Sequence, residues 1–141
     1  MYEVWKEFKF DCAHTLDGGP RGDGRYTRLH GHSYQAEVWL RGARTSHGWV
    51  IDLGALDLRL ADIAKKLDHS FLTEIEALGA PTMENIASFI WNDLSDISAL
   101  FKVTVRRDSL NEGCSYYGPG PSSERLSHGL TENCDKEMAH A

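Results

Sequence analysis

The sequence has few cysteines and no long hydrophobic run. Its three cysteines are an odd number without C-x-x-C spacing, which is typical of a protein in a reducing compartment that has no disulfide framework. The first ten residues, MYEVWKEFKF, lack the basic start and apolar run of a signal peptide. No stretch approaches the length that spans a bilayer. We therefore expect a cytoplasmic protein with no membrane partner.

Positive charge is also scarce. The chain has 15 Lys and Arg against 21 Asp and Glu, which gives a net charge of −6. This balance argues against nucleic acid as a partner, because polyanions bind surfaces rich in positive charge. An anionic small molecule would need a local basic patch.

The hydrophobic pattern predicts one α+β domain with the order strand, strand, helix, helix, strand, strand. Period-two patterning places strands near residues 3–13 and 33–42, and Tyr116 and Tyr117 in a short last strand. Helical spacing predicts two helices that begin near Gly54 and near Pro81-Thr82. Their expected caps are Asp52 and Thr82, and their expected apolar stripes are Leu56, Leu60, Ile63 and Leu67 in the first helix and Ile86, Ile90, Leu94 and Ile97 in the second.

The third strand, residues 101–108, alternates between apolar and polar side chains. The face expected under the helices carries Phe101, Val103 and Val105, and the polar face carries Lys102, Thr104, Arg106 and Asp108. Two helices would cover only one face of a four-stranded antiparallel sheet and leave both edges open, which favours association into a closed barrel. Residues 119–141 are polar and irregular, so we expect a domain of residues 1–118 followed by a polar extension.

Three histidines are the candidate functional residues. His14 ends the first strand in FDCAH, and His30 and His32 lie in LHGHSY. Because strand side chains alternate, His30 and His32 share a face, and pairing of the two strands would bring three imidazoles together. Three neutral imidazoles with an open fourth position are typical of a catalytic zinc site. The residues alone leave open the alternative of ordinary surface or core histidines.

Six segments together resemble the 6-pyruvoyltetrahydropterin synthase / 6-carboxytetrahydropterin synthase family. They are FDCAH, LHGHSY, GWVIDLGALD, LDHSFL, APTMENIASFIW and GCSYYG, in the family's order and spacing over residues 1 to about 118. The resemblance implies the tunnelling fold, in which subunits of β-β-α-α-β-β order join their sheets into a barrel, usually as a homohexamer. It also implies Zn²⁺ held by His14, His30 and His32.

The resemblance further implies a pterin substrate, 7,8-dihydroneopterin triphosphate. Zinc would act as a Lewis acid on the side chain at C6, while a base removes a proton from carbon and an acid returns one. Asp68 and His69 match the family's Asp-His pair, in which the carboxylate orients the imidazole. The alternative for this pair is a polar end to the first helix, where the helix dipole favours a histidine.

The sequence departs from the family at the catalytic cysteine. The corresponding position is Tyr26 in the carboxy-type pattern and falls near Gly24 in the pyruvoyl-type pattern, and no cysteine lies between His14 and His30. A phenol is a poorer base than a thiol near neutral pH, unless neighbours such as Arg25 and Arg28 lower its pKa. Cys12 has the strand parity of His14 and is a second candidate, although a small buried hydrophobic residue explains it too.

A second departure concerns the residue that grips the pterin. The family uses a glutamate on the third strand, and counting back from Gly113-Cys114 places Asp108 there. Its position on the polar face favours this role, and an ordinary turn residue is the alternative. Thr82 and Glu84 match the family's PT-x-E segment as substrate-binding residues, although a plain cap explains Thr82 equally well.

Two functions remain open on these residues. The first is a zinc-dependent pterin side-chain lyase that gives the 6-carboxy or the 6-pyruvoyl product, with another group in place of the thiol. The second is a non-catalytic or re-purposed paralogue that binds a pterin. The intact histidines and the Asp68-His69 pair favour the enzyme, whereas the missing cysteine and the change from glutamate to Asp108 favour the paralogue.

Overall fold

The fold is an antiparallel sheet covered on one face by two helices. The computed structural model describes residues 1–120. The polar extension predicted for residues 119–141 therefore falls almost entirely outside the described residues, as does Cys134. Among residues 1–120, no helix is both long enough and apolar enough to cross a membrane.

The sheet follows the order of the chain. Each strand pairs antiparallel with the next, in the order β1-β2-β3-β4. The strands are β1 (Tyr2–His14), β2 (His30–Gly42), β3 (Leu100–Arg107) and β4 (Glu112–Tyr116). Both long strands extend beyond the predicted bounds, and β2 begins at His30 itself. The predicted α+β fold is confirmed.

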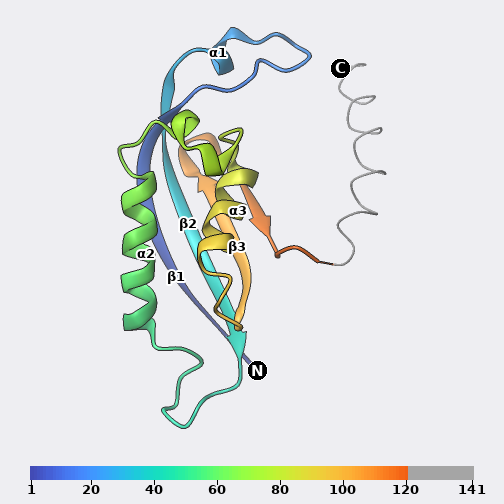
Figure 1. Ribbon diagram of the computed structural model, residues 1–141. Helices are drawn as coiled ribbons and strands as arrows, with labels where there is room; N and C mark the ends of the chain where they lie inside the picture. The colour runs from blue at the N-terminus through green and yellow to red at the C-terminus, as the bar shows by residue number, and fades with distance from the viewer. Residues whose placement is uncertain (121–141) are drawn as a thin grey trace.

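The two main helices lie over the same face of the sheet, α2 (Leu53–Leu67) along β1 and α3 (Met83–Asp93) along β3 and β4 (Figure 1). Both predicted caps are confirmed, because the Asp52 side chain accepts from Gly54 N–H and Thr82 accepts from Asn85 N–H. The remaining helical segments are short: α1 (Gly24–Thr27), η1 (Leu72–Glu74), η2 (Glu76–Leu78) and η3 (Asp108–Leu110).

The core lies between the helices and the sheet. Most of the predicted helix stripes form it, with Leu56, Leu60, Ile63, Leu67, Ile86, Ile90 and Leu94 all buried. Ile97, predicted as the end of the second stripe, lies beyond the end of α3 and is half-buried. From the sheet, Phe10, Tyr34, Ala36, Val38 and Leu40 face them. The apolar packing ends where β1 ends and β2 begins. Figure 1 shows the loop that carries α1 extending past this end of the sheet.

The strict alternation predicted for β3 is wrong at its start. The pairing of β2 with β3 shifts between Trp39 and Leu40, so that Leu100 rather than Phe101 lies opposite Leu40 and is buried. A bulge of this kind inserts one residue and changes which side chain faces the core. Phe101 instead packs under the Arg41 guanidinium, 4.1 Å from the ring centroid. Val103 and Val105 are buried as predicted.

The face away from the helices carries a polar network. Arg106 pairs with Glu37 on β2 and with Asp108, and Thr104 donates to the same Glu37 carboxylate. Burial raises the pKa of Glu37, but hydrogen bonds from Trp39 and Arg106 outweigh it and hold this pKa below its usual range. This network fixes charged side chains on the uncovered face of the sheet, opposite the core.

Candidate metal centre

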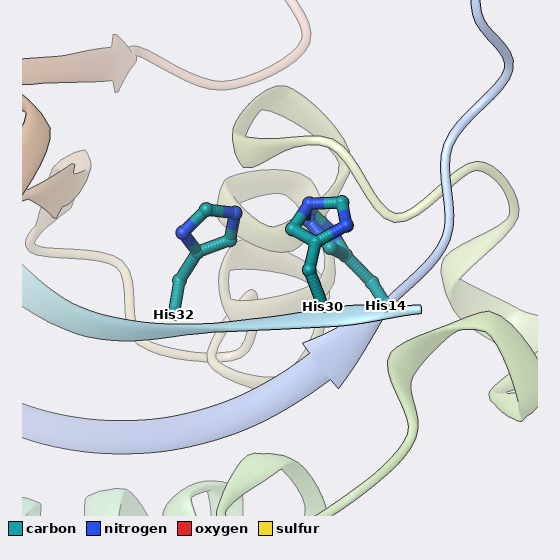
Figure 2. Close-up of side chains that lie close together, drawn as sticks. All are labelled: His14, His30 and His32. Atoms are coloured by element: carbon teal, nitrogen blue, oxygen red, sulfur yellow. Dashed lines mark hydrogen bonds between the residues drawn. The ribbon is translucent and has the colours of Figure 1, made fainter. Parts of the chain in front are cut away.

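The three histidines stand together at the end of the core. In the β1–β2 register, His14 lies directly opposite His30, and Cys12 lies opposite His32. All three imidazoles therefore rise from one side of the strand pair, as Figure 2 shows. Their candidate ligand nitrogens all lie within 4.8 Å of one another. The predicted convergence of His14, His30 and His32 is confirmed.

Backbone carbonyls hold two of the rings in a defined orientation. His14 Nδ1 lies 2.9 Å from Pro81 O, and His30 Nδ1 lies 2.7 Å from Arg28 O. A carbonyl only accepts, so both Nδ1 atoms carry the proton and both Nε2 atoms carry a lone pair. Metal-bound histidines in proteins are oriented by this kind of second hydrogen bond.

The two Nε2 atoms point at each other across 2.9 Å. With both Nδ1 protons committed to carbonyls, two neutral rings have no proton to share across this contact. A cation bound by both lone pairs removes their repulsion. The donor set of three imidazole nitrogens, with no carboxylate in the cluster, is the one that Zn²⁺ accepts in catalytic sites. The residues present therefore fit a zinc ion.

The surroundings keep two of these rings, His14 and His32, neutral. Burial lowers the pKa of His14, whose side chain is 1 % exposed. Burial, helped by the positive charge of Arg107 and by the neighbouring histidines, lowers the pKa of His32 to about 4. A neutral imidazole is the form that binds a metal, so near pH 7 these two ligands need no deprotonation.

A hollow of about 380 Å³ opens beside His30 and His32, and we call it the histidine pocket. Its lining consists of Arg25, Tyr26, His30, His32, Arg107, Leu110 and Glu112. Tyr26 comes from α1, which the side chain of Asp23 caps by accepting from Arg25 N–H. The structure thus brings Tyr26, the predicted replacement for the cysteine, to the same pocket as two of the histidines. Its side chain is 43 % exposed.

Cys12 lies beside the cluster but is poorly suited to be a base. It is buried, and it lines a separate small hollow with Asp11, Gly31 and His32. Burial, together with the negative charges of Asp11 and Asp68, raises the pKa of its thiol to about 12. A thiol that keeps its proton near neutral pH behaves as a small hydrophobic side chain.

Asp68 and His69 form a pair on the outer edge of β1. His69 Nδ1 donates to an Asp68 carboxylate oxygen at 2.9 Å, and the His69 side chain is 83 % exposed. The backbone fixes the pair, because Asp11 N–H donates to the other Asp68 oxygen and His69 N–H donates to Asp11 O. His69 has φ 54°, in the left-handed region, where the chain turns from α2 to run along β1. Neither residue lines the histidine pocket of its own chain.

The predicted substrate-binding residues lie in two places, the start of α3 and the segment that follows β3. Thr82 is the cap of α3 and follows Pro81, whose carbonyl orients His14. Glu84 is exposed in the first turn of α3. Asp108 contacts Arg106 and lines a hollow with Lys9 and Gln35 rather than the histidine pocket.

Asp108 continues the polar face, as its alternation predicted, whereas the histidines lie on the opposite, helix-covered face of the sheet. They continue the row of Phe10 and Tyr34 on the helix-covered face, whereas Asp108 follows the polar network. The residue on the histidine side at the end of β3 is Arg107. Alternation places Arg107 on the same face as the buried Val103 and Val105. The sequence did not show that this face carries the metal cluster, so Arg107 was missed.

The Asp68–His69 pair gives a test by titration. The Asp68 carboxylate raises the pKa of His69 through its hydrogen bond and its charge, so this imidazole keeps its proton to a higher pH than an ordinary histidine. Asp68→Asn should lower the His69 pKa while its side-chain oxygen still accepts from Asp11 N–H. NMR titration of isotope-labelled histidine measures it. Asp62→Asn, an equal change of charge on α2, should leave the His69 pKa unchanged, and an unchanged value in Asp68→Asn would show that the pair does not form.

Comparison with known proteins agrees with these features. The sequence model described as 6-pyruvoyl tetrahydropterin synthase matches residues 3–119. A 6-carboxy-5,6,7,8-tetrahydropterin synthase from Synechocystis is 32% identical over 84% of this chain and 95% of its own length. The enzyme of the same name from Haemophilus influenzae is 34% identical over 75% of this chain and 91% of its own length.

Solved structures give the same answer. The 6-pyruvoyl tetrahydropterin synthase of Caenorhabditis elegans superposes with a TM-score of 0.72 at 26% identity, over 84% of this chain and 96% of its own. The Plasmodium vivax protein of the same name shares the fold at 21% identity, with a TM-score of 0.66 over 84% of this chain and 98% of its own. The chain therefore belongs to the 6-pyruvoyl tetrahydropterin synthase family and is a lyase of that family.

Proposed function

We propose that the protein is a zinc-dependent lyase that acts on the side chain of 7,8-dihydroneopterin triphosphate or a close relative. The observation that carries this proposal is the pair of Nε2 lone pairs on His14 and His30, held toward one point by two backbone carbonyls beside an open pocket. The similarity to enzymes named 6-carboxy-5,6,7,8-tetrahydropterin synthase supports the carboxy product over the pyruvoyl product.

The roles of the residues follow from their chemistry. His14, His30 and His32 would hold the zinc ion, which supplies Lewis-acid polarisation of oxygen atoms on the pterin side chain. Tyr26 is the proposed group that moves a proton at the carbon next to those oxygens, because it lines the same pocket. Thr82, Glu84 and Asp108 remain predicted contacts to the pterin ring. They lie outside the lining of the pocket within one chain.

The Asp68–His69 pair would act on a pocket of another subunit. It stands exposed on the edge of β1 that faces away from β2. Within residues 1–120, this edge contacts residues 68–71 near its end and has no partner strand along Tyr2–Lys9. Open edges of this length favour pairing between copies. We propose a closed oligomer, a homohexamer as the family resemblance implies, in which this pair meets the histidine pocket of a neighbouring copy and exchanges protons there.

Removal of a ligand tests the metal and the reaction together. His30→Ala should lose most of the zinc of the purified protein, because two neutral ligands bind the ion far more weakly than three. The variant should also form no product from 7,8-dihydroneopterin triphosphate. Elemental analysis and mass spectrometry of the products measure the two outcomes.

The matched control is His47→Ala, which removes an exposed histidine stacked on Trp49. It should keep both zinc and product. Full zinc content in His30→Ala would remove this histidine from the site. A wild-type protein that binds zinc and pterin but releases no product would support the alternative, a pterin-binding paralogue.

The replacement of the cysteine is tested at Tyr26. Tyr26→Phe should lower turnover by about 10²–10⁴-fold, the usual cost of losing a general acid or base, with zinc content unchanged. Tyr117→Phe, at an exposed tyrosine that does not line the pocket, should keep full activity. An active Tyr26→Phe together with an inactive, zinc-loaded Cys12→Ser would assign the proton to Cys12 instead.

A further inference from the structure

Arg107 lines the histidine pocket and has no role in the proposed reaction. It is the last residue of β3 and lies on the helix-covered side of the sheet, in line with Val103 and Val105. Its guanidinium carbon lies 5.9 Å from the ring centroid of Tyr34, which itself stands 5.8 Å from the ring of His32. Arg107 therefore forms the wall of the pocket next to the metal cluster.

The ion pair with Glu112 fixes this arginine in place. Arg107 Nη2 donates to Glu112 Oε1 at 2.6 Å across the β3–β4 pairing, where the two residues are direct partners. The Arg107 side chain is 15% exposed, and its Nε has no hydrogen-bond partner in residues 1–120. Glu112 thus engages Nη2 of the guanidinium, and the other N–H groups of Arg107 remain to donate to a further acceptor.

The charged side chains that line the pocket are two arginines, Arg25 and Arg107, and one carboxylate, Glu112. Glu112 is the only carboxylate in its lining, and Arg107 already engages it. The three imidazoles are neutral ligands, so a bound Zn²⁺ would keep both of its positive charges. Arg25 adds a further guanidinium, although Asp23 pairs with it at 2.6 Å. With zinc bound, the pocket would therefore be locally positive in a protein with a net charge of −6, which is what an anionic ligand requires.

We infer that Arg107 is a specificity-determining residue, which binds an oxyanion group of the ligand, a phosphate or a carboxylate, beside the metal. A guanidinium is always charged and offers only donors in a planar fork, so it selects an anionic acceptor and excludes a ligand that presents donors there. The inference rests on the proposed function for the metal. It adds the chemical class of the group that lies next to it.

The experiment uses simple oxyanions as probes and requires no turnover. Calorimetric titration of the zinc-loaded protein with inorganic phosphate, and separately with acetate, at constant ionic strength gives the two affinities. Arg107→Gln should weaken the binding of the preferred anion by about 10- to 100-fold, the cost of a lost hydrogen bond to a charged group. The probe with the higher affinity in the wild-type protein identifies phosphate or carboxylate as the group.

Two further variants keep the test decisive. Arg59→Gln removes the same charge from α2, where Arg59 forms an exposed ion pair with Asp96, and should leave anion binding unchanged. Glu112→Gln removes the competing carboxylate and should tighten anion binding, an outcome that remains available if Arg107→Gln fails to fold.

Equal affinity in the wild-type protein and Arg107→Gln, or no anion binding by the wild-type protein, would overturn the inference. Neither result depends on product formation. The lyase proposal can therefore fail while this inference stands, and this inference can fail while the lyase proposal stands.

Discussion

The register between β1 and β2 is the constraint on which the site depends. It places His14 opposite His30 and sets His32 two residues further along the same face. A slip of one residue would turn every side chain of one strand to the other face and separate the imidazoles. The same register buries Phe10 against Tyr34, whose rings stack 5.1 Å apart, so the packing of the core and the assembly of the metal cluster select one pairing.

Gly31 shows how closely the strands must approach at this point. A Cβ built at Gly31 would lie 3.3 Å from the carbonyl oxygen of Cys12, tighter than an ordinary contact. Glycine between the two β2 ligands therefore permits the pairing that brings them to His14. The start of α3 completes the arrangement from another direction, because the Pro81 carbonyl that precedes the Thr82 cap orients the His14 ring. Helix position and ligand orientation are coupled through that single hydrogen bond.

The sequence was sufficient for those features that follow from short-range periodicity. Period two identified the three histidines as neighbours, and helical spacing identified the buried stripes of α2 and α3 with their caps. It failed where a single residue changes the phase, as the bulge at Trp39 and Leu40 does for Phe101. Alternation placed Asp108 on the polar face, but the alternation of one strand does not say which face carries the metal ligands of another, so the role of Asp108 stays a prediction.

Other features of the site depend on contacts between distant segments. The carbonyl partners of His14 and His30 carry no side-chain signature, and Arg107 enters the pocket only because β3 ends level with Tyr34 on β2. The Asp68–His69 pair was found by resemblance, and its location on the edge of β1 became visible only in the fold. The pair does not line the pocket of its own chain, so its proposed action depends on how several chains assemble.

The central claim is that three histidines and no sulfur bind the metal, with one position left open for the ligand. X-ray absorption spectroscopy of the zinc-loaded protein tests it directly. The account predicts a first shell of nitrogen and oxygen at about 2.0–2.1 Å with the scattering pattern of three imidazoles and one lighter, exchangeable ligand. Scattering from sulfur at about 2.3 Å, or from fewer than three imidazoles, would contradict it.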